Sequence, residues 1–183
     1  MTSLFDQVSF EHGPAMKNRF MLAPLTNQQS HEDGTLSDDE YKWLTMRAQG
    51  GFGLTMTCAS HVQAIGQGFA GQLGCFDDKH IPGLTRLADG IKQHGSVAIV
   101  QLHHAGRRSP AELIGGQPVS SGADEKMGAR AMTTGEVEEM IEAFIYTTSI
   151  TKEERAFRAL PLEERRQKCM EMFIGRKTLK SSG

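Results

Sequence analysis

The sequence predicts an α/β fold built on a parallel sheet. Short apolar runs that stop at Pro or Gly alternate along the chain with longer segments in which apolar residues recur every three or four positions. The composition is that of a globular protein, with 38% hydrophobic residues, 23% charged residues and a formal net charge of -2. At 183 residues, the chain has the length of one ordinary domain.

The first strand and helix are expected between residues 19 and 50. Residues 19–23 form a short apolar run that Pro24 stops, because proline has no amide hydrogen for a sheet ladder. Ser37 and Glu40 then have the spacing of a capping box, and apolar residues recur at helical spacing up to Gly50. This order gives one strand followed by one helix.

Two further strands enclose a second helix. Residues 54–59 and residues 97–102 are apolar runs of strand length, and between them apolar residues at helical spacing end at Gly95. Residues 66–74 are rich in glycine but do not open a helix, as the phosphate-binding turn of a Rossmann fold does, so we interpret them as a loop. Strands that alternate with helices in this way pair in parallel.

Beyond the third strand the pattern becomes less regular. Residues 109–131 contain Gly, Pro and Ser throughout without a clear period, and they predict a long loop or excursion outside the core. Thr133 and Glu136 again have capping-box spacing, and they open a helix that runs through Phe144. From residue 151 onward the sequence is charged and rich in arginine, and it predicts two short helices.

Polar side chains follow the third predicted strand directly. The run from Gln101 to Arg107 carries an amide, two imidazoles and a guanidinium at the end of a strand, where barrel enzymes keep their chemistry. Because His103 and His104 are adjacent, a strand would point them to opposite faces, so they cannot both bind one metal from it. The three cysteines lie far apart without a Cys-x-x-Cys pair, so we expect reduced thiols and no metal site.

Three runs of residues together point to a family. Residues 21–26 (Met-Leu-Ala-Pro-Leu-Thr), residues 51–54 (Gly-Phe-Gly-Leu) and the run from Gln101 to Arg107 closely resemble the flavin-dependent old yellow enzyme family. The resemblance extends from about residue 5 to about residue 145. Members of this family are NAD(P)H-dependent oxidoreductases that carry FMN on a (β/α)8 TIM barrel.

A complete barrel of this kind takes about 250 residues. The resemblance therefore implies a partial (β/α)8 TIM barrel, made of its first strands and helices, with a helical C-terminal tail. We divide the chain into residues 1–145, the N-terminal part of an FMN-binding barrel, and residues 146–183, an unrelated charged tail. The implied cofactors are FMN and, as reductant, NAD(P)H, and the implied partner is a small-molecule electron acceptor.

The family's flavin contacts fall on three predicted strand ends. The resemblance implies cofactor binding by Ala23, Pro24, Leu25, Thr26, Ala59 and Gln101. The Thr26 hydroxyl would lie near the redox-active side of the ring, the short Ala59 would let the backbone approach the flavin carbonyl region, and the Gln101 amide would pair with the N3 and O2 edge. His104 would support the site, and Arg107 would meet negative charge of the flavin or substrate.

Two parts of the family pattern have no counterpart in this sequence. Nothing after Ile145 matches the His-x-x-Asn or His-x-x-His pair that holds the substrate's activating oxygen, and Gln28 stands where several relatives carry an aromatic residue. The half of the family barrel that binds the FMN phosphate, near the seventh and eighth strands, is missing as well. We therefore assign no catalytic residue.

Two functions stay open. The first is an FMN-dependent NAD(P)H oxidoreductase, truncated, whose reduced flavin reduces an electron-poor alkene or a similar acceptor. The alternative is a non-catalytic barrel fragment that acts as an interaction module or is an inactive truncated product. An incomplete barrel exposes unpaired backbone groups and apolar faces at its terminal strands. The tail could fold back over them as substitute helices, a second copy in a homo-oligomer could complete the barrel, or the chain is an unstable product of a shortened reading frame.

Other classes of partner are not expected. Basic residues of the tail are interleaved with Glu163, Glu164 and Glu171, as on a solvated helical face, so we expect no nucleic-acid partner. No apolar run reaches the roughly 18 residues that span a membrane, and the N-terminus lacks the basic and then apolar order of a signal peptide. We expect a cytoplasmic protein without membrane contact.

Overall fold

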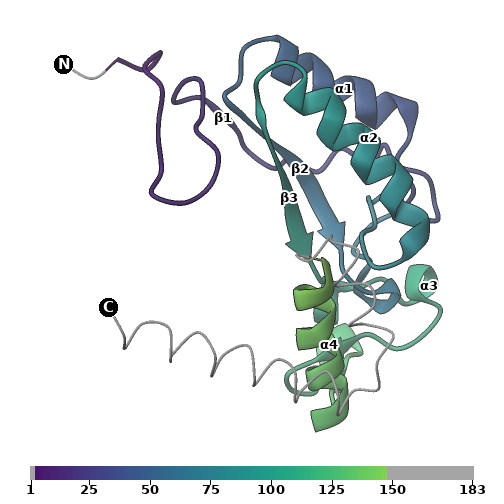
Figure 1. The fold of residues 1–183 in the computed structure, drawn as a ribbon. Helices are drawn as coiled ribbons and strands as arrows, with labels where there is room; N and C mark the ends of the chain where they lie inside the picture. The colour runs from purple at the N-terminus through teal and green to yellow at the C-terminus, as the bar shows by residue number, and fades with distance from the viewer. Residues whose placement is uncertain (1–2, 148–183) are drawn as a thin grey trace, which may run out of the picture. The chain divides into compact units, whose positions relative to one another are not determined.

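Three parallel strands form the central sheet, and Figure 1 shows them side by side. The computed structural model describes residues 3–147, so the helices expected in the tail lie outside the described residues. In order across the sheet, the strands are β1 (Met21–Leu22), β2 (Leu54–His61) and β3 (Val97–His103). Both pairings are parallel, which confirms the α/β class expected from the sequence.

The first strand is shorter than the sequence predicts, with two residues in place of residues 19–23. The amide of Phe20 donates to Oδ1 of Asn18 at 3.1 Å, so this amide does not take part in the ladder. On the other side, Pro24 has no amide hydrogen to continue the pairing. β1 is therefore a short strand between two fixed interruptions.

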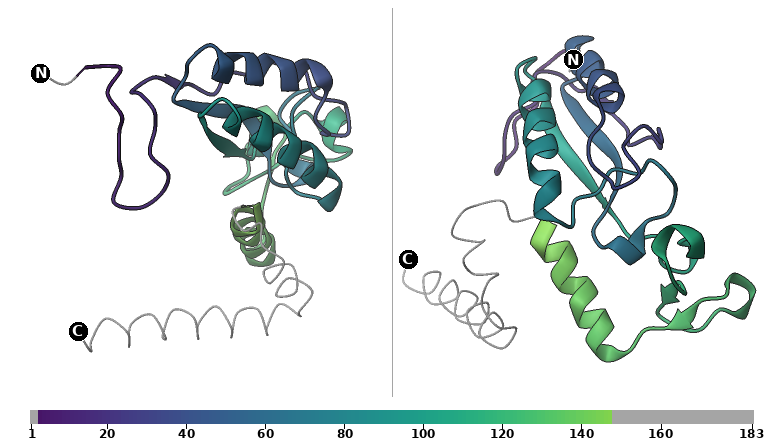
Figure 2. Two further views of the ribbon diagram at one scale, coloured as in Figure 1. Left: turned by 45° about the horizontal axis from the view of Figure 1, so that its top comes forward. Right: turned by 90° about the vertical axis from the view of Figure 1, so that its right-hand side faces the viewer.

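Two helices cover one face of the sheet. α1 (Asp38–Gln49) and α2 (Ile81–Lys92) lie next to each other, as the views in Figure 2 show. The buried core beneath them consists of Leu22, Leu44, Ala48, Leu87 and Ile91. Full burial of one large aliphatic side chain contributes about 1.5–3 kcal/mol, so this cluster is a main source of the stability of the described residues.

The opposite face of the sheet is partly exposed within residues 3–147. Side chains alternate along a strand, so the register places Met21, Leu54 and Val97 together on the face away from the helices. Met21 is 50% exposed, and Ile99 on the same face is 38% exposed. An apolar surface of this kind is typical of an interface or of the interior of a closed barrel.

The capping box expected at the start of α1 is only half present. Ser37 does cap the helix, because its Oγ accepts from the backbone amide of Glu40 at 3.1 Å. The Glu40 carboxylate, however, turns into the interior, where it accepts hydrogen bonds from Ser30, Cys58 and Asn27. The Glu40 carboxylate therefore binds donors in the interior, and it does not bind the helix end as the capping-box pattern predicts.

The second expected capping box is complete. In front of α4 (Thr134–Thr147), Oγ1 of Thr133 accepts from the Glu136 amide at 3.3 Å, and the Glu136 carboxylate accepts from the Thr133 amide at 2.8 Å.

No helix within the described residues is long and apolar enough to cross a membrane.

Irregular structure fills the two long connections. The 3-10 turns η1 (Ala64–Gly66) and η2 (Asp78–His80) lie between β2 and α2. The segment after β3 contains η3 (Gly106–Arg108), α3 (Ala111–Ile114), β4 (Val119–Ser120), η4 (Glu125–Met127) and β5 (Arg130–Ala131). The segment expected as a long loop or excursion, residues 109–131, thus contains a short β4–β5 pairing, which two-residue strands do not reveal as a periodic pattern in a sequence.

Candidate functional site at the carboxyl ends of the strands

The ends of β2 and β3 bring two of the sequence-predicted residues together. Ala59 and Gln101 are register partners on neighbouring strands. Just before them the register shifts between Met56 and Ala59, and the Gln101 amide nitrogen donates to Oγ1 of Thr57 at 3.1 Å. Irregularities of this kind re-aim side chains at the ends of strands.

The side-chain amide of Gln101 is free to bind a ligand. Gln101 is half-buried, and within residues 3–147 its side-chain oxygen and nitrogen make no hydrogen bond. A glutamine amide offers one acceptor and two donors in a plane. It can therefore pair with a planar molecule that presents both kinds of group along one edge.

The segment from Ala23 to Thr26 follows β1 and so starts at the same edge of the sheet. Pro24 is half-buried, whereas Ala23, Leu25 and Thr26 are exposed, with Leu25 56% exposed. These residues offer an apolar surface and a hydroxyl beside the open face of the sheet.

The turn after this segment is held against the glycine-rich loop. Gln28 has a φ of 53°, which costs a non-glycine residue about 1–2 kcal/mol. Its carbonyl oxygen lies so close to Gly71 that a Cβ atom on Gly71 would come within 2.5 Å of it. The amide of Ser30 also donates to the Gly71 carbonyl at 3.0 Å. Contacts far apart in the sequence therefore fix the conformation of this turn.

Gln72 is a site residue that the sequence did not reveal. Its side chain is fully buried, and its Nε2 donates to the Ala59 carbonyl oxygen at 2.8 Å. Nε2 also lies 3.1 Å from Nδ1 of His103, while Oε1 accepts from the Gly68 amide at 2.7 Å. One buried amide thus links the loop to the ends of β2 and β3.

These bonds also fix the protonation of His103. Because Gln72 presents an N–H group to Nδ1 of His103, Nδ1 must accept, and the proton of the neutral ring lies on Nε2. Burial lowers the pKa of His103, which favours this neutral form. No local sequence pattern marks Gln72, a glutamine in a glycine-rich loop, as the residue that links these strand ends.

His104 lies beyond the end of β3 and supports the turn that follows. Its Nδ1 accepts from the Gly106 amide at 3.0 Å, and a Cβ atom on Gly66 would meet its ring at 2.5 Å. Burial lowers the pKa of this imidazole as well. The ring therefore packs between two loops, and a supporting role in the site remains a prediction.

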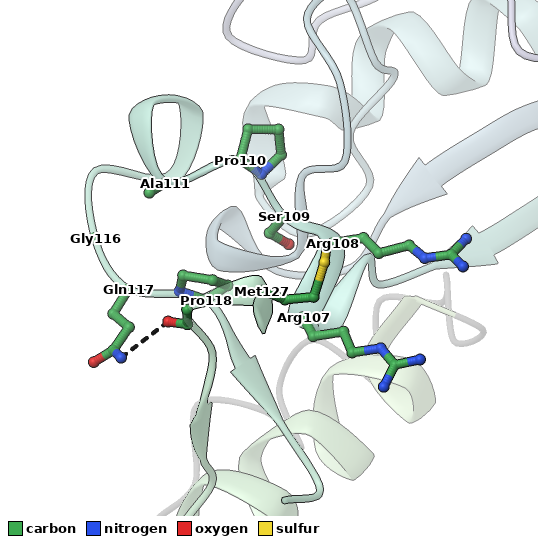
Figure 3. A pocket seen from close by; sticks show the side chains of 10 residues that line it. Arg107, Arg108, Ser109, Pro110, Ala111, Gly116, Gln117, Pro118 and Met127 are labelled. Carbon is green, nitrogen blue, oxygen red and sulfur yellow. Dashed lines mark hydrogen bonds between the residues drawn. The ribbon is translucent and has the colours of Figure 1, made fainter. Parts of the chain in front are cut away.

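Arg107 is paired within the segment after β3. Its guanidinium donates to the Asp124 carboxylate at 3.0 Å. Figure 3 shows the Arg107 and Arg108 side chains extending away from Pro110 and Ala111. A role of Arg107 toward a flavin or substrate stays a prediction.

A hollow of about 510 Å³ lies in this same segment (Figure 3). Its lining consists of Arg107, Arg108, Ser109, Pro110, Ala111, Gly116, Gln117, Pro118, Met127 and Gly128. The amide of Gln117 is already used, because it donates to the Gly128 carbonyl at 3.0 Å. The sequence-predicted flavin contacts from Ala23 to Gln101 do not line this hollow.

The buried imidazoles and thiols near β2 do not suggest nucleophilic or metal chemistry. Burial lowers the pKa of His61 to about 4 and raises the pKa of Cys75 to about 12. Burial, together with the nearby Glu40 carboxylate, also raises the pKa of Cys58, so this residue stays a thiol. Among the described residues, no three His, Cys, Asp or Glu side chains are grouped as metal ligands.

The groups at the strand ends fit the ring of a flavin. A flavin presents donors and acceptors along its pyrimidine edge and an apolar dimethylbenzene edge, and Gln101 supplies an unpaired amide for the first. Leu25 and the open apolar face of the sheet supply surface of the second kind. The small side chain of Ala59, opposite Gln101, leaves the backbone approachable.

Comparisons with known proteins match most of the chain to one family of oxidoreductases. The profile of the NADH:flavin oxidoreductase / NADH oxidase family matches residues 3–156. A protein named as a probable NADH-dependent flavin oxidoreductase, YqiG of Bacillus subtilis, is 39% identical over 145 residues, which are 77% of this chain and 39% of that protein. The chain thus spans about two fifths of the length of this curated relative.

Solved structures match the fold. A 2-naphthoyl-CoA reductase in complex with 2-naphthoyl-CoA superposes with a TM-score of 0.74 and 31% identity, over 79% of this chain and 24% of that one. An old yellow enzyme homologue from Zymomonas mobilis superposes with a TM-score of 0.72 and 24% identity, over 80% of this chain and 44% of that one. The described strands and helices are therefore part of an α/β barrel, as the resemblance implied.

Proposed function

The chain belongs to the NADH:flavin oxidoreductase / NADH oxidase family, and from this we propose that it binds FMN and takes part in the NAD(P)H-dependent reduction of a small-molecule acceptor. The acceptor class that the family resemblance favours is an electron-poor alkene. The single observation that carries the proposal is the unpaired Gln101 amide opposite Ala59, at the carboxyl ends of parallel strands.

Each of the proposed contacts has a separate task. The Gln101 amide would hold the N3 and O2 edge of the flavin, and Leu25 with Pro24 would lie against the ring. The Thr26 hydroxyl would lie near the redox-active side, and Gln72 would keep the backbone of Ala59 in place through its carbonyl. When bound, FMN supplies the acceptor and donor of hydride, which side chains cannot provide.

The proposal is tested first by cofactor binding. We expect the purified chain to be yellow or to become so on titration with FMN, and Gln101→Leu to weaken FMN binding about tenfold, from the loss of hydrogen bonds worth about 1–3 kcal/mol. Gln93→Leu is the matched control, because Gln93 is exposed at the far end of α2. A colourless chain that takes up no FMN would rule out flavin binding.

Reduction is tested next. Anaerobic addition of NADH or NADPH should bleach the visible absorbance of the bound flavin, and an added electron-poor alkene should restore it. A flavin that stays oxidised would leave a flavin-binding protein without the proposed activity.

A second candidate function is an interaction module that completes its sheet with another chain. The exposed Met21 and Ile99 on the open face favour it, as do Val137, Ile141 and Ile145, which follow one another at helical spacing along α4 and are each more than a third exposed. Analytical ultracentrifugation distinguishes the two: a homo-oligomer without flavin supports the module, whereas a flavin-containing monomer contradicts it.

A further inference from the structure

Glu40 contributes a fully buried carboxylate to the interior behind the candidate flavin site. It occupies the third position of α1, where a capping box would turn it back toward the helix end. Instead, one carboxylate oxygen accepts from Oγ of Ser30, and the other accepts from Sγ of Cys58 at 3.0 Å and from Nδ2 of Asn27 at 3.3 Å. The three donors come from two different parts of the fold.

We propose that Glu40 is a positioning residue that holds two of the three strand ends of the flavin site, through Asn27 and Ser30 on one side and Cys58 on the other. The inference rests on the proposed function, since that function defines the site. Asn27 and Ser30 lie in the turn that follows Thr26, and Cys58 directly precedes Ala59. One carboxylate therefore connects the end of β1 with the end of β2.

The Asn27 side-chain nitrogen requires an acceptor at this place, because it can only donate. A carboxylate accepts through both of its oxygens and so takes all three donors, whereas a glutamine amide keeps one acceptor oxygen and leaves one of these donors without its acceptor. The orientation of Asn27 is fixed independently, because its Oδ1 accepts from the Gln29 amide at 3.3 Å, which leaves Nδ2 for Glu40. Asn27 is thus fixed as a donor, and the Ser30 hydroxyl and the Cys58 thiol donate to the same carboxylate.

The turn at residues 27–30 needs these hydrogen bonds because its backbone conformation is strained. Gln28, between Asn27 and Ser30, has a positive φ that disfavours a residue with a side chain. A conformation of this kind persists only where the surroundings impose it. The bonds to Glu40, together with the bond from the Ser30 amide to Gly71, are the contacts that impose it.

The test compares two glutamates at equivalent positions. Glu40→Gln is the test variant, and Glu136→Gln is the control, because Glu136 also occupies the third position of a hydroxyl-capped helix but binds Thr133 and Arg130. In the full chain, hydrogen–deuterium exchange is followed in peptides that cover residues 23–36. FMN is titrated by visible absorbance, and the difference spectrum of bound FMN is recorded.

We expect Glu40→Gln to speed exchange at residues 27–30 and to weaken FMN binding, each about tenfold, and to shift the flavin difference spectrum. Glu136→Gln should leave all three unchanged. Equal exchange at residues 27–30 in Glu40→Gln and in the parent chain overturns the proposal. A parent chain that binds no FMN contradicts the proposed function alone, because exchange still reports whether Glu40 holds the turn.

Three further variants keep the test decisive if circular dichroism shows that Glu40→Gln does not fold. Ser30→Ala removes one donor and should speed exchange in the same peptides, and unchanged exchange there overturns the proposal. Cys58→Ser keeps a donor and should retain the parent's FMN affinity and spectrum, whereas Cys58→Ala should lose part of both. If the serine and alanine variants behave alike, the connection to β2 is refuted.

Discussion

The side-chain nitrogen of Gln72 donates a hydrogen bond to the carbonyl oxygen of Ala59 at a distance of 2.8 Å. The same amide serves His103 and the backbone of Gly68, so the ends of two strands and one loop depend on a single buried side chain. Buried polar networks of this kind stabilise a unique arrangement only when every member has its partner.

Replacement of this amide should therefore be costly. Gln72→Leu removes the partners of the half-buried Ala59 carbonyl and Gly68 amide, and we expect the free energy of unfolding to fall by about 1–3 kcal/mol. Urea denaturation followed by circular dichroism measures it. Gln117→Leu, which changes an exposed glutamine, should cost far less, and equal losses in the two variants would contradict the role of the network.

The parts of the fold that depend on neighbouring residues could be predicted from the sequence. Pro24, the Ser37 cap and the Thr133–Glu136 box each act within a few residues, so their patterns are visible in the chain. The resemblance also gave Ala59 and Gln101, which the register places opposite each other.

The remaining site contacts join residues that are distant in the chain. Glu40 and Cys58 are 18 residues apart, and Gln72 and His103 are 31 apart, so no local period or spacing connects them. Glu40 shows the conflict directly, since its local pattern predicts a helix cap while its tertiary partners draw it into the core. Tertiary donors therefore overrode the local preference.

Acid should destabilise the protein through His61. Burial lowers the pKa of His61 to about 4 in the folded chain, against its usual 6.5. Between these two pH values the imidazole is protonated in the unfolded state but stays neutral in the folded state. The contribution of His61 to the free energy of unfolding is therefore fully present above about pH 6.5 and is lost as the pH falls toward 4. We expect a loss of about 2–3 kcal/mol from this residue over that interval.

The contribution of His61 to the pH dependence of the unfolding free energy is measured by comparing variants. Urea denaturation between pH 7 and pH 4 should give a flatter stability profile for His61→Leu than for the parent chain. His12→Gln, at an exposed imidazole, should keep the parent's slope. A slope that is the same in His61→Leu as in the parent would show that this imidazole titrates normally.

The ion pair at the start of α4 should be visible in the titration of one carboxyl group. The guanidinium of Arg130 donates to both carboxylate oxygens of Glu136, at 2.9 and 2.5 Å, and together with the Thr133 amide it lowers the pKa of Glu136 to about 2. We expect Arg130→Gln to raise this pKa toward its usual 4.5, as followed by NMR of the side-chain carboxyl carbon.

The control for this measurement is another arginine. Arg108 makes no side-chain hydrogen bond or ion pair within the described residues, so Arg108→Gln should leave the Glu136 titration in place. A shift of equal size in both variants would mean that overall charge, and not the paired geometry, sets the pKa.

The contact between Gly71 and the Gln28 carbonyl should make Gly71 the less replaceable of two glycines with the same backbone conformation. Gly71 has a φ of 68° and Gly115 a φ of 66°. Alanine at either position therefore lowers the free energy of unfolding by a similar amount, about 1–2 kcal/mol, because the left-handed conformation disfavours a side chain. A Cβ atom on Gly71 would in addition lie 2.5 Å from the Gln28 oxygen, whereas at Gly115 nothing lies within 4 Å.

Gly71→Ala must therefore displace the turn that follows Thr26, and overpacking of this kind costs about 1–3 kcal/mol more. We expect a larger loss of unfolding free energy than in Gly115→Ala, with faster hydrogen exchange at residues 27–30 and weaker binding of FMN in Gly71→Ala alone. If the two variants lose the same stability and exchange alike, the close approach of the two loops does not hold the turn.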